Sequence, residues 1–359
     1  MTTKKQIMKT PYFIMHQTKL ERNLNKLQEI EKQSGVKILH TIKSFNQESV
    51  LPIIASKLSG MSIGNINELR MAQKAEGQHI HLYAPAYKKE ELIEIIDKVS
   101  TLSFNSLSQW ESLHHLKTKA SMGLRINPRL HLPIPNHCNP NLDYSRLGVE
   151  YLEFIEFFNK NFSNFDELEG LHFHALFQSS EVGTELLLEH LLEHYQTLLP
   201  QLKWINLGGG HEFTSDNFSV NNFSKAVKNF QDLYPKIQLY FEPGEAVTKG
   251  CGEFISTVLD IIHIAGVNVV ILDTSTETHL LDVAIVNQRL KVKGTQSEST
   301  PYFYELSGNS CIQGDLIGEY FFQEPLFIGD KVVFEDMMGY SMVKMTEFNG
   351  IEKASFILQ

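Results

Sequence analysis

Val36-Lys37-Ile38-Leu39-His40-Thr41-Ile42-Lys43 reads as a short buried strand that ends on a lysine. Seven further strand-like runs follow it, at residues 60–63, 79–83, 101–104, 120–126, 169–173, 204–207 and 238–241. Helical patterns separate most of the runs, and the clearest extends from Thr184 to Leu199. Eight strands with intervening helices predict a closed, TIM-like (β/α)8 barrel, whose chemistry lies at the C-terminal ends of the strands. An open, doubly wound sheet is the alternative.

After about residue 246 the alternation of strand and helix gives way to strand-like runs at 254–258, 267–272, 331–334 and 340–345. Long helical stripes are absent from this part, whereas Lys19–Lys32 reads as a helix near the N-terminus. We therefore expect residues 18–245 to form the barrel, and residues 1–17 with 246–359 to form a mainly β domain, a sandwich or small barrel. The stretch from Asn127 to Tyr144 has no periodic pattern and predicts a long loop.

The composition narrows the class of protein. The 359 residues carry a formal net charge of −10 without a basic block, which argues against a nucleic-acid surface. Three widely spaced cysteines give neither a disulfide framework nor a zinc signature, and this fits a reducing compartment. No segment has the apolar length of a signal peptide or a membrane span. The sequence predicts a cytoplasmic protein without a metal site.

Several reactive residues follow the C-terminal ends of the expected strands. Lys43 has apolar neighbours, and partial burial would lower the pKa of its amine and make it a nucleophile. Most lysines at such places are solvated surface charges instead. The run Gly208-Gly209-Gly210 after the seventh strand could form an anion nest for a phosphate, or merely a tight turn. Glu242, at the end of the eighth strand, could pair with a pyridinium nitrogen or form a salt bridge to a neighbouring loop.

Two further patterns bear on the chemistry. His172 and His174 alternate with apolar residues on the sixth strand, so both point to the same side. They could bind a metal, stack on a planar cofactor or simply be satisfied in the core, and no third metal ligand is evident nearby. Cys311 and Asp315 share a glycine-flanked loop and could supply a proton donor and a cation-binding carboxylate, although buried cysteines are usually inert.

The order of these motifs resembles the fold-type III, alanine racemase-like decarboxylases that use pyridoxal 5'-phosphate (PLP), and within them the carboxynorspermidine (carboxyspermidine) decarboxylases. The resemblance runs from Thr10 to Gly350. It rests on the following stretches: His81-Leu82-Tyr83-Ala84-Pro85-Ala86-Tyr87-Lys88, Leu124-Arg125-Ile126-Asn127-Pro128, Ser145-Arg146-Leu147-Gly148, Gly170-Leu171-His172-Phe173-His174, Glu242-Pro243-Gly244-Glu245-Ala246 and Ile271-Leu272-Asp273-Thr274-Ser275.

The resemblance implies a role for each site residue. Lys43 would hold the cofactor covalently, His174 would stack on its ring, and Glu242 would bind its ring nitrogen. Gly208, Gly209, Gly210 and Tyr340 would bind its phosphate, and Arg125 would lie at its ring face or oxygen. The family forms homodimers with shared sites, so Cys311, the proton donor, and Asp315 would come from the partner subunit. The expected substrate contacts are Gln178, Glu245, Asp273 and Asp315, and the substrate would be a carboxylated polyamine.

The chain also departs from the family pattern. Phe177-Gln178 stands where Cys-Glu is typical, and Leu280–Arg289 lacks the usual Met-Pro-Asp-Val and Pro-Tyr-Arg tracts. These departures leave the cofactor residues intact and concern the choice of substrate. Decarboxylases of meso-diaminopimelate or ornithine are alternatives, but they carry Arg where this chain has Glu245. A catalytically silent, PLP-binding regulatory homologue is a further alternative, against which the complete set of site residues argues.

Overall fold

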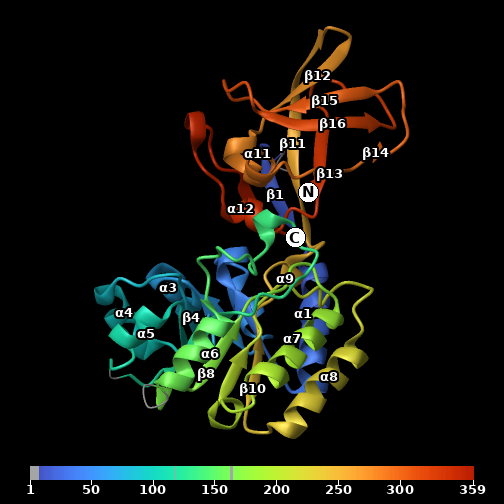
Figure 1. Ribbon diagram of the computed structural model, residues 1–359. Coiled ribbons are helices and arrows are strands. Elements are labelled where there is room, and N and C mark those ends of the chain that lie inside the picture. Colours follow the sequence, from blue (N-terminus) through green and yellow to red (C-terminus); the bar gives the residue numbers. More distant parts are fainter. Residues whose placement is uncertain (1–7, 117, 162–164) are drawn as a thin grey trace, which may run out of the picture. The chain divides into compact units, whose positions relative to one another are not determined.

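The computed structural model describes residues 8–116, 118–161 and 165–359. The chain divides into two compact units. One unit is Arg22–Val247, and the other joins the N-terminal segment up to Glu21 to Thr248–Gln359. Figure 1 shows the elements of both units along the chain.

The first unit is built on eight parallel strands that close into a barrel. These are β2 (Lys37–Thr41), β3 (Gly60–Ile63), β4 (His79–Tyr83), β5 (Thr101–Phe104), β6 (Ser121–Asn127), β8 (Gly170–Phe173), β9 (Trp204–Asn206) and β10 (Gln238–Phe241). Their order is β5-β4-β3-β2-β10-β9-β8-β6, and the pairing of β5 with β6 closes the ring. A two-residue strand, β7 (Val149–Glu150), adds to β6. The predicted closed barrel is confirmed, and the open sheet is wrong.

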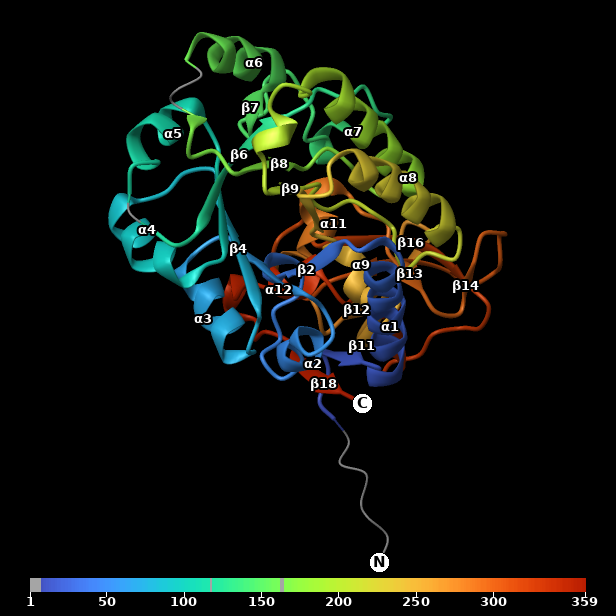
Figure 2. The same ribbon diagram turned by 90° about the horizontal axis from the view of Figure 1, so that it is seen from below.

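Helices lie around the outside of these strands, as Figure 2 shows for α3 to α8. The helices are α1 (Gln17–Ser34), α2 (Leu51–Ala55), α3 (Ile66–Lys74), α4 (Lys89–Ile95), α5 (Leu107–Leu113), α6 (Tyr151–Lys160), α7 (Glu181–His194) and α8 (Val220–Leu233). The prediction carried α7 on to Leu199, but the helix stops at His194. Tyr195 leaves the helical region, and Leu199 begins the separate 3-10 turn Leu199–Gln201. None of the helices described has both the length and the apolar character to cross a membrane.

The inside of the barrel is polar. Residues that alternate with the helix-facing Ile80, Leu82, Leu102 and Phe104 are histidines and hydroxyl residues, and many of them are buried. The buried polar residues of the barrel strands include His81, Thr101, Ser103, Arg125, His172 and Asn206. Barrel interiors are usually filled with branched apolar side chains. Buried polar groups need hydrogen-bond partners, so this interior must form an ordered network.

The second unit is mainly β, as predicted. Its strands are β1 (Tyr12–Met15), β11 (Gly252–Ile264), β12 (Val267–Leu272), β13 (Lys291–Val292), β14 (Thr295–Gln296), β15 (Phe303–Ser307), β16 (Leu316–Phe322), β17 (Lys331–Glu335) and β18 (Ser355–Leu358). They form a mixed sheet in the order β13-β17-β11-β12-β15-β16-β14, while β1 pairs with both β11 and β18. Four short helices complete the unit: α9 (Glu245–Thr248), which crosses from the barrel, α10 (Thr276–His279), α11 (Leu281–Val286) and α12 (Tyr340–Val343).

The predicted strand at 340–345 is wrong, because residues Tyr340–Val343 form the single turn of α12. Its turn is closed by backbone bonds, in which Val343 N donates to Gly339 O and Lys344 N donates to Tyr340 O. A run of six residues is too short for apolar spacing to separate strand from helix. The long loop predicted over 127–144 is present, with one 3-10 turn at Asn136–Cys138.

A buried histidine of the barrel makes the stability of this protein depend on pH. His40 is fully buried on β2, its Nε2 bonds the carbonyl of Phe45 at 2.8 Å, and burial lowers the pKa of its ring to about 4. The unfolded chain takes up a proton below about pH 6.5, whereas the folded chain resists it down to about pH 4. This contribution to stability is therefore constant above pH 6.5 and is lost as the pH falls from 6.5 towards 4.

We expect His40→Gln to lower the pH slope of the unfolding free energy between pH 6 and 5 by about 1.4 kcal/mol per pH unit. Denaturant titrations of the purified protein at a series of pH values would measure this slope. His137→Gln, which replaces an exposed histidine, is the control and should leave the slope unchanged. An equal slope in the His40 variant and the unmodified protein would contradict this assignment.

Candidate active site

The C-terminal ends of β2 and β10 bring Lys43 and Glu242 to the same edge of the barrel. The two strands are hydrogen-bonded neighbours. Lys43 lies in the 3-10 turn Ile42–Ser44 that follows β2, and Glu242 follows β10 directly. Thr41 Oγ1 donates to the carbonyl of Glu242 at 3.2 Å, and Ser44 Oγ donates to the carbonyl of Gly244 at 3.2 Å. These bonds hold the two strand ends together on either side of the lysine.

The environment of Lys43 favours a reactive amine. Its side chain is accessible to water, yet protein surrounds the amine and reduces its hydration, which lowers the pKa of Lys43 from its ordinary value. The Glu242 carboxylate opposes this shift, and the Arg125 guanidinium adds to it. A lysine with a lowered pKa offers more of the neutral amine that attacks a carbonyl carbon.

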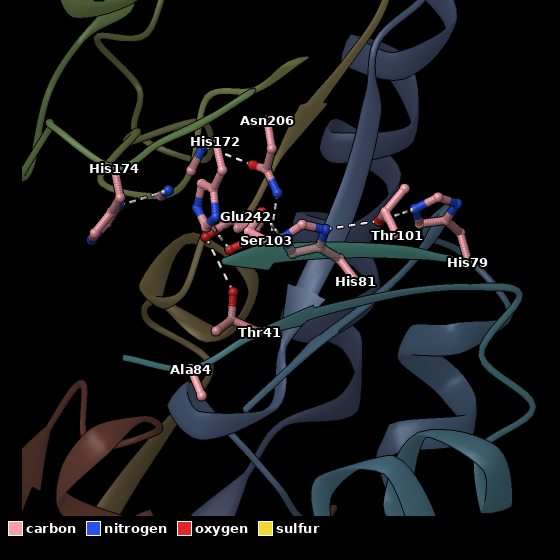
Figure 3. Close-up of polar contacts among 12 residues, drawn as sticks. Thr41, His79, His81, Ala84, Thr101, Ser103, His172, His174, Asn206 and Glu242 are labelled. Carbon is pink, nitrogen blue, oxygen red and sulfur yellow. Dashed lines mark hydrogen bonds and ion pairs between the residues drawn. The ribbon is translucent and has the colours of Figure 1, made fainter. Parts of the chain in front are cut away.

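Glu242 is held at the centre of a group of buried polar side chains, which Figure 3 shows. Its Oε1 accepts a hydrogen bond of 2.7 Å from Asn206 Nδ2. His81 Nε2 lies 3.8 Å from Oε1, and His172 Nε2 lies 4.0 Å from Oε2. The Glu242 side chain is 10% exposed, so it is largely enclosed by these residues but not completely buried.

Asn206 is a site residue that the sequence analysis missed. Besides donating to Glu242, it accepts a hydrogen bond of 2.9 Å from Gly208 N at its Oδ1. Both ends of the amide are therefore fixed, and the side chain is fully buried. A polar residue that closes a buried strand, as in Trp204-Ile205-Asn206, is the signal that could have found it. Asn206 links the carboxylate of Glu242 to the glycine loop.

We expect Asn206→Ala to lower the unfolding free energy by about 1–3 kcal/mol, because it leaves a buried N–H and a carboxylate oxygen without their partner. The same variant should bind the cofactor more weakly, since both the carboxylate and the loop lose a fixed position. Chemical denaturation and a titration with the cofactor would measure the two effects. Asn67→Ala, which changes an exposed asparagine on α3, serves as the control. Unchanged stability and affinity in Asn206→Ala would rule out this linking role.

The glycine run is needed for close packing of the loop after β9. A Cβ on Gly208 would lie 2.3 Å from the carbonyl of Phe173, and one on Gly210 would lie 2.0 Å from that of Leu176. Gly208 N donates to Asn206, and Gly209 N donates to His174 Nδ1 at 3.0 Å. Two of the three predicted phosphate donors are thus already used within the protein, so a cradle made of all three N–H groups is not what the structure forms.

The bond from Gly209 also fixes His174. Because Nδ1 of His174 accepts this hydrogen bond, the neutral ring carries its proton on Nε2. Burial, followed by the nearby charge of Arg125, lowers the pKa of His174 well below its usual value. His172 points to the Glu242 carboxylate, whereas His174 lies beyond the strand end against the glycine loop. The two histidines therefore do not act as one pair.

Arg125 brings a buried positive charge with unused hydrogen-bond donors into the barrel. The residue is 3% exposed, its guanidinium lies 4.6 Å from the centre of the Tyr83 ring, and its Nε and Nη2 have no hydrogen-bond partner among the described residues. Burial lowers the pKa of Arg125. A buried guanidinium with free donors is costly unless an acceptor reaches it. This orphan group therefore fits a ligand that carries oxygen atoms or negative charge.

The part of the chain that the structure describes contains one group of three side chains with metal-ligand geometry. It consists of His81, His172 and Glu242, whose ligand atoms all lie within 4.8 Å of one another. His174 does not belong to the group, so the hypothesis that His172 and His174 bind a metal together is wrong. One Glu242 oxygen is already bound by Asn206, and we treat the group as part of the surroundings of that carboxylate.

The other predicted site residues of the barrel unit lie on loops. Gln178 is exposed in the loop after β8, with a φ of 43°. The next residue, Ser179, pairs with the segment after the glycine run, because its N–H donates to Gly210 O at 2.8 Å. Glu245 is exposed at the start of α9.

Two predicted substrate contacts lie in the β unit with their carboxylates already engaged. Asp315 is 2% exposed; its Oδ1 accepts from Thr276 N and Oγ1 at 2.7 and 2.9 Å, and its Oδ2 accepts from Ser310 N at 3.0 Å. Asp273 accepts from Ser256 Oγ at 2.6 Å, from Thr257 N at 2.7 Å and from Thr10 Oγ1 at 2.5 Å. These bonds anchor the local chain, and contact with a substrate stays a prediction for both residues.

The two remaining predicted residues also lie in the β unit. Cys311 is exposed in the loop that Asp315 anchors, where a thiol can reach a reacting molecule. Tyr340 opens α12 and is half-buried, with the amine of Lys344 5.1 Å from the centre of its ring.

Comparison with known proteins identifies the family. Residues 18–249 match the family model of the pyridoxal-dependent decarboxylase, pyridoxal binding domain. The chain belongs to the pyridoxal-dependent decarboxylases. This decarboxylase is 36% identical to the carboxynorspermidine/carboxyspermidine decarboxylase of Campylobacter jejuni, over 98% of this chain and 93% of the relative. It is 33% identical to the carboxyaminopropylagmatine decarboxylase of Synechocystis, over 95% of this chain and 88% of the relative.

A solved structure agrees with this assignment. The crystal structure of carboxynorspermidine decarboxylase from Campylobacter jejuni complexed with norspermidine aligns with a TM-score of 0.88 at 34% identity. The alignment covers 98% of this chain and 94% of that one. The predicted family, fold class, decarboxylase activity and PLP cofactor are thereby confirmed.

The residues at the barrel edge fit PLP. The cofactor has an aldehyde for an amine, a ring nitrogen for a carboxylate, and a phosphate and a ring oxygen for cationic donors. The amine of Lys43 has a lowered pKa, the side chain of Glu242 is not completely buried, and the guanidinium of Arg125 has unused donors. The aldehyde, the ring nitrogen and the oxygen atoms of the cofactor therefore each have a matching group among these three residues.

Proposed function

We propose that the decarboxylase acts on carboxynorspermidine or carboxyspermidine and produces norspermidine or spermidine in polyamine biosynthesis. The observation that carries this proposal is the similarity to the Campylobacter jejuni enzyme of that name over nearly the whole of both chains. Matching groups for the cofactor at the barrel edge support it independently. Diaminopimelate decarboxylases are more distant, for example at 25% identity over 71% of this chain.

In this proposal Lys43 would hold the cofactor covalently through its amine. Glu242 holds the proton on the ring nitrogen, His174 packs on the ring, and Arg125 binds an oxygen of the cofactor. Gly210 and Tyr340 contribute to binding of the phosphate, while Gly208 and Gly209 shape the loop. When bound, PLP supplies the sink for the electron pair that loss of CO2 leaves behind.

The residues of the β unit complete the reaction in this proposal. The enzyme works as a homodimer, in which Cys311 of one subunit delivers a proton to the product carbon at the site of the other. Asp315 positions the loop of Cys311 and, with Asp273, Glu245 and Gln178, adds polar or acidic groups for the cationic amines of the substrate. The exposed Cys311 carries a free thiol, which is consistent with a cytoplasmic enzyme.

A second candidate substrate is carboxyaminopropylagmatine, because a relative named for that activity is 33% identical over 95% of this chain. This candidate ends in a guanidinium where the carboxylated polyamines end in an amine. The planar guanidinium favours a bidentate carboxylate, whereas an ammonium is served by separate acceptors. Gln178 offers one carbonyl oxygen in place of a carboxylate, which favours the ammonium.

A panel assay tests the proposal. The purified, PLP-loaded enzyme is incubated with carboxynorspermidine, carboxyspermidine, carboxyaminopropylagmatine, diaminopimelate and ornithine, and both CO2 and the amine product are measured. We expect the highest kcat/KM with one of the first two compounds. Preference for carboxyaminopropylagmatine would move the assignment to the second candidate. Release of CO2 from diaminopimelate or ornithine alone, or from none of the five, would overturn it.

A further inference from the structure

A chain of hydrogen-bonded side chains runs through the inside of the barrel and ends next to Glu242 (Figure 3). Thr101 Oγ1 lies 3.1 Å from His79 Nε2 and 2.8 Å from His81 Nδ1. On the other side of its ring, His81 Nε2 lies 3.2 Å from Ser103 Oγ and 3.8 Å from Glu242 Oε1. His81, Thr101 and Ser103 are buried, whereas His79 is half-buried and stacks on Tyr240 with 4.6 Å between ring centres.

The two histidines of this hydrogen-bonded chain, His79 and His81, are neutral, so each ring carries one proton. Burial lowers the pKa of His79 to about 4, and burial also lowers the pKa of His81, which the Glu242 carboxylate only partly offsets. A neutral ring can carry its proton on either nitrogen, and the hydrogen bonds it makes decide between the two tautomers. The hydrogen bonds along this chain of side chains can therefore run in either of two directions, depending on which ring nitrogens carry the protons.

Both directions satisfy the hydrogen bonds among His79, Thr101 and His81. In one, His79 Nε2–H donates to Thr101, whose hydroxyl donates to His81 Nδ1, and His81 carries its proton on Nε2. In the other, Ser103 donates to His81 Nε2, His81 Nδ1–H donates to Thr101, and Thr101 donates to His79. Thr101 allows either direction because a hydroxyl both donates and accepts.

The Glu242 carboxylate decides between the two directions. An ionised carboxylate only accepts hydrogen bonds, so it attracts an N–H dipole and repels a nitrogen lone pair. At 3.8 Å in a buried environment this preference is strong, although the contact is too long for a formed hydrogen bond. His81 therefore carries its proton on Nε2. Thr101 then donates to His81 Nδ1 and accepts from His79, so His79 also carries its proton on Nε2.

We propose that His81 is a positioning residue for the cofactor's carboxylate partner. Held as the Nε2–H tautomer in a chain that Glu242 orients, it directs its N–H at the carboxylate and holds it opposite the ring nitrogen of PLP. Asn206 fixes the same oxygen of Glu242 from the neighbouring strand. The inference rests on the proposed role of Glu242, but the tautomer of His81 can be measured without assuming that role.

The first test reads the tautomers by two-bond ¹H–¹⁵N NMR of the holoenzyme labelled with ¹⁵N-histidine, with His79→Gln and His81→Gln to assign the signals. We expect the Nε2–H tautomer for both residues. In Thr101→Val, which removes the hydroxyl between them, His81 should stay Nε2–H while His79 becomes a mixture. Thr184→Val, elsewhere in the unit, is the control, because it removes a buried hydroxyl that has no hydrogen-bond partner among the described residues. An Nδ1–H or charged His81, or a His79 unaffected by Thr101→Val, would overturn the proposal.

The second test measures PLP affinity in two variants of similar size. Gln at position 81 can place its amide N–H where Nε2 lies and keep a donor towards Glu242. Asn ends near the Nδ1 position, so it keeps the contact with Thr101 and loses the donor. We expect His81→Asn to raise the Kd for PLP about tenfold, and His81→Gln by less than about threefold. A merely structural role would weaken both variants alike, and equal Kd values for the two would reject the proposal. If Glu242→Ala leaves the cofactor spectrum unchanged while His81 is the Nε2–H tautomer, the proposed role of Glu242 at the ring nitrogen is wrong. The direction of the hydrogen bonds through His81 would still be as inferred.

Discussion

Lys43→Ala is expected to lower the decarboxylation rate by at least about 10⁴-fold, because it removes both the covalent anchor of the cofactor and a positioned proton carrier. The variant should also lose the visible absorbance band of the lysine-bound cofactor. The side chain of Lys43 is accessible and its amine has a lowered pKa, which suits Lys43 to this role at the barrel edge. Rates of CO2 release and absorbance spectra of the purified variant measure both effects.

Lys37→Ala is the matched control for this prediction. Lys37 begins the strand β2 that leads to Lys43, and it is exposed at the opposite end of that strand. We expect this variant to keep the full rate and the absorbance band. If Lys43→Ala keeps the band and more than about one hundredth of the rate, Lys43 is not the anchor.

Glu242→Ala has the second-largest expected effect, a fall in kcat of about 10²–10³-fold. A preorganised charged partner at a reacting group contributes on this scale. In the described part of the chain, Asn206 binds no other carboxylate that could take the place of Glu242. The absorbance band should persist at a shifted position, because Lys43 still binds the cofactor while the ring nitrogen has lost its partner. Steady-state kinetics and a pH series of spectra measure the change.

Glu169→Gln provides the control for a barrel carboxylate. Glu169 lies beside the N-terminal end of β8, where it accepts from Ser121 Oγ at 2.5 Å and pairs with Lys203. The Glu169→Gln variant should therefore keep the spectrum and the rate of the unmodified enzyme. A kcat in Glu242→Ala within about threefold of the unmodified enzyme would show that the carboxylate is not needed at the ring nitrogen.

The barrel could be predicted from the sequence because its signals are local. Each short apolar run is a complete strand, and closure of the ring brings every C-terminal strand end to one edge. Lys43 and Glu242 could therefore be placed together from separate runs, 199 positions apart in the printed sequence. The helix at Tyr340–Val343 could not be predicted in this way, since so short a run has no usable period.

The network behind the site depends on which strands are neighbours, and local patterns do not contain that information. Asn206 binds Glu242 across 36 positions of the chain, and Thr101 joins His79 to His81 from the next strand. The same limit applies to Asp315 and Asp273, whose types suggest substrate contacts although their carboxylates are engaged within the β unit. Residue type identified candidates, and the partners came from the structure.

Chemical fixation of the cofactor tests the central claim, that Lys43 carries PLP, most directly. Reducing the PLP-loaded enzyme with sodium borohydride makes the bond to the holding amine permanent, and peptide mass spectrometry then locates the added group. We expect it in close to one copy per chain on the peptide that contains Lys43. A group found on another lysine, or an enzyme that decarboxylates its substrate yet carries no fixed cofactor on Lys43, would contradict the account.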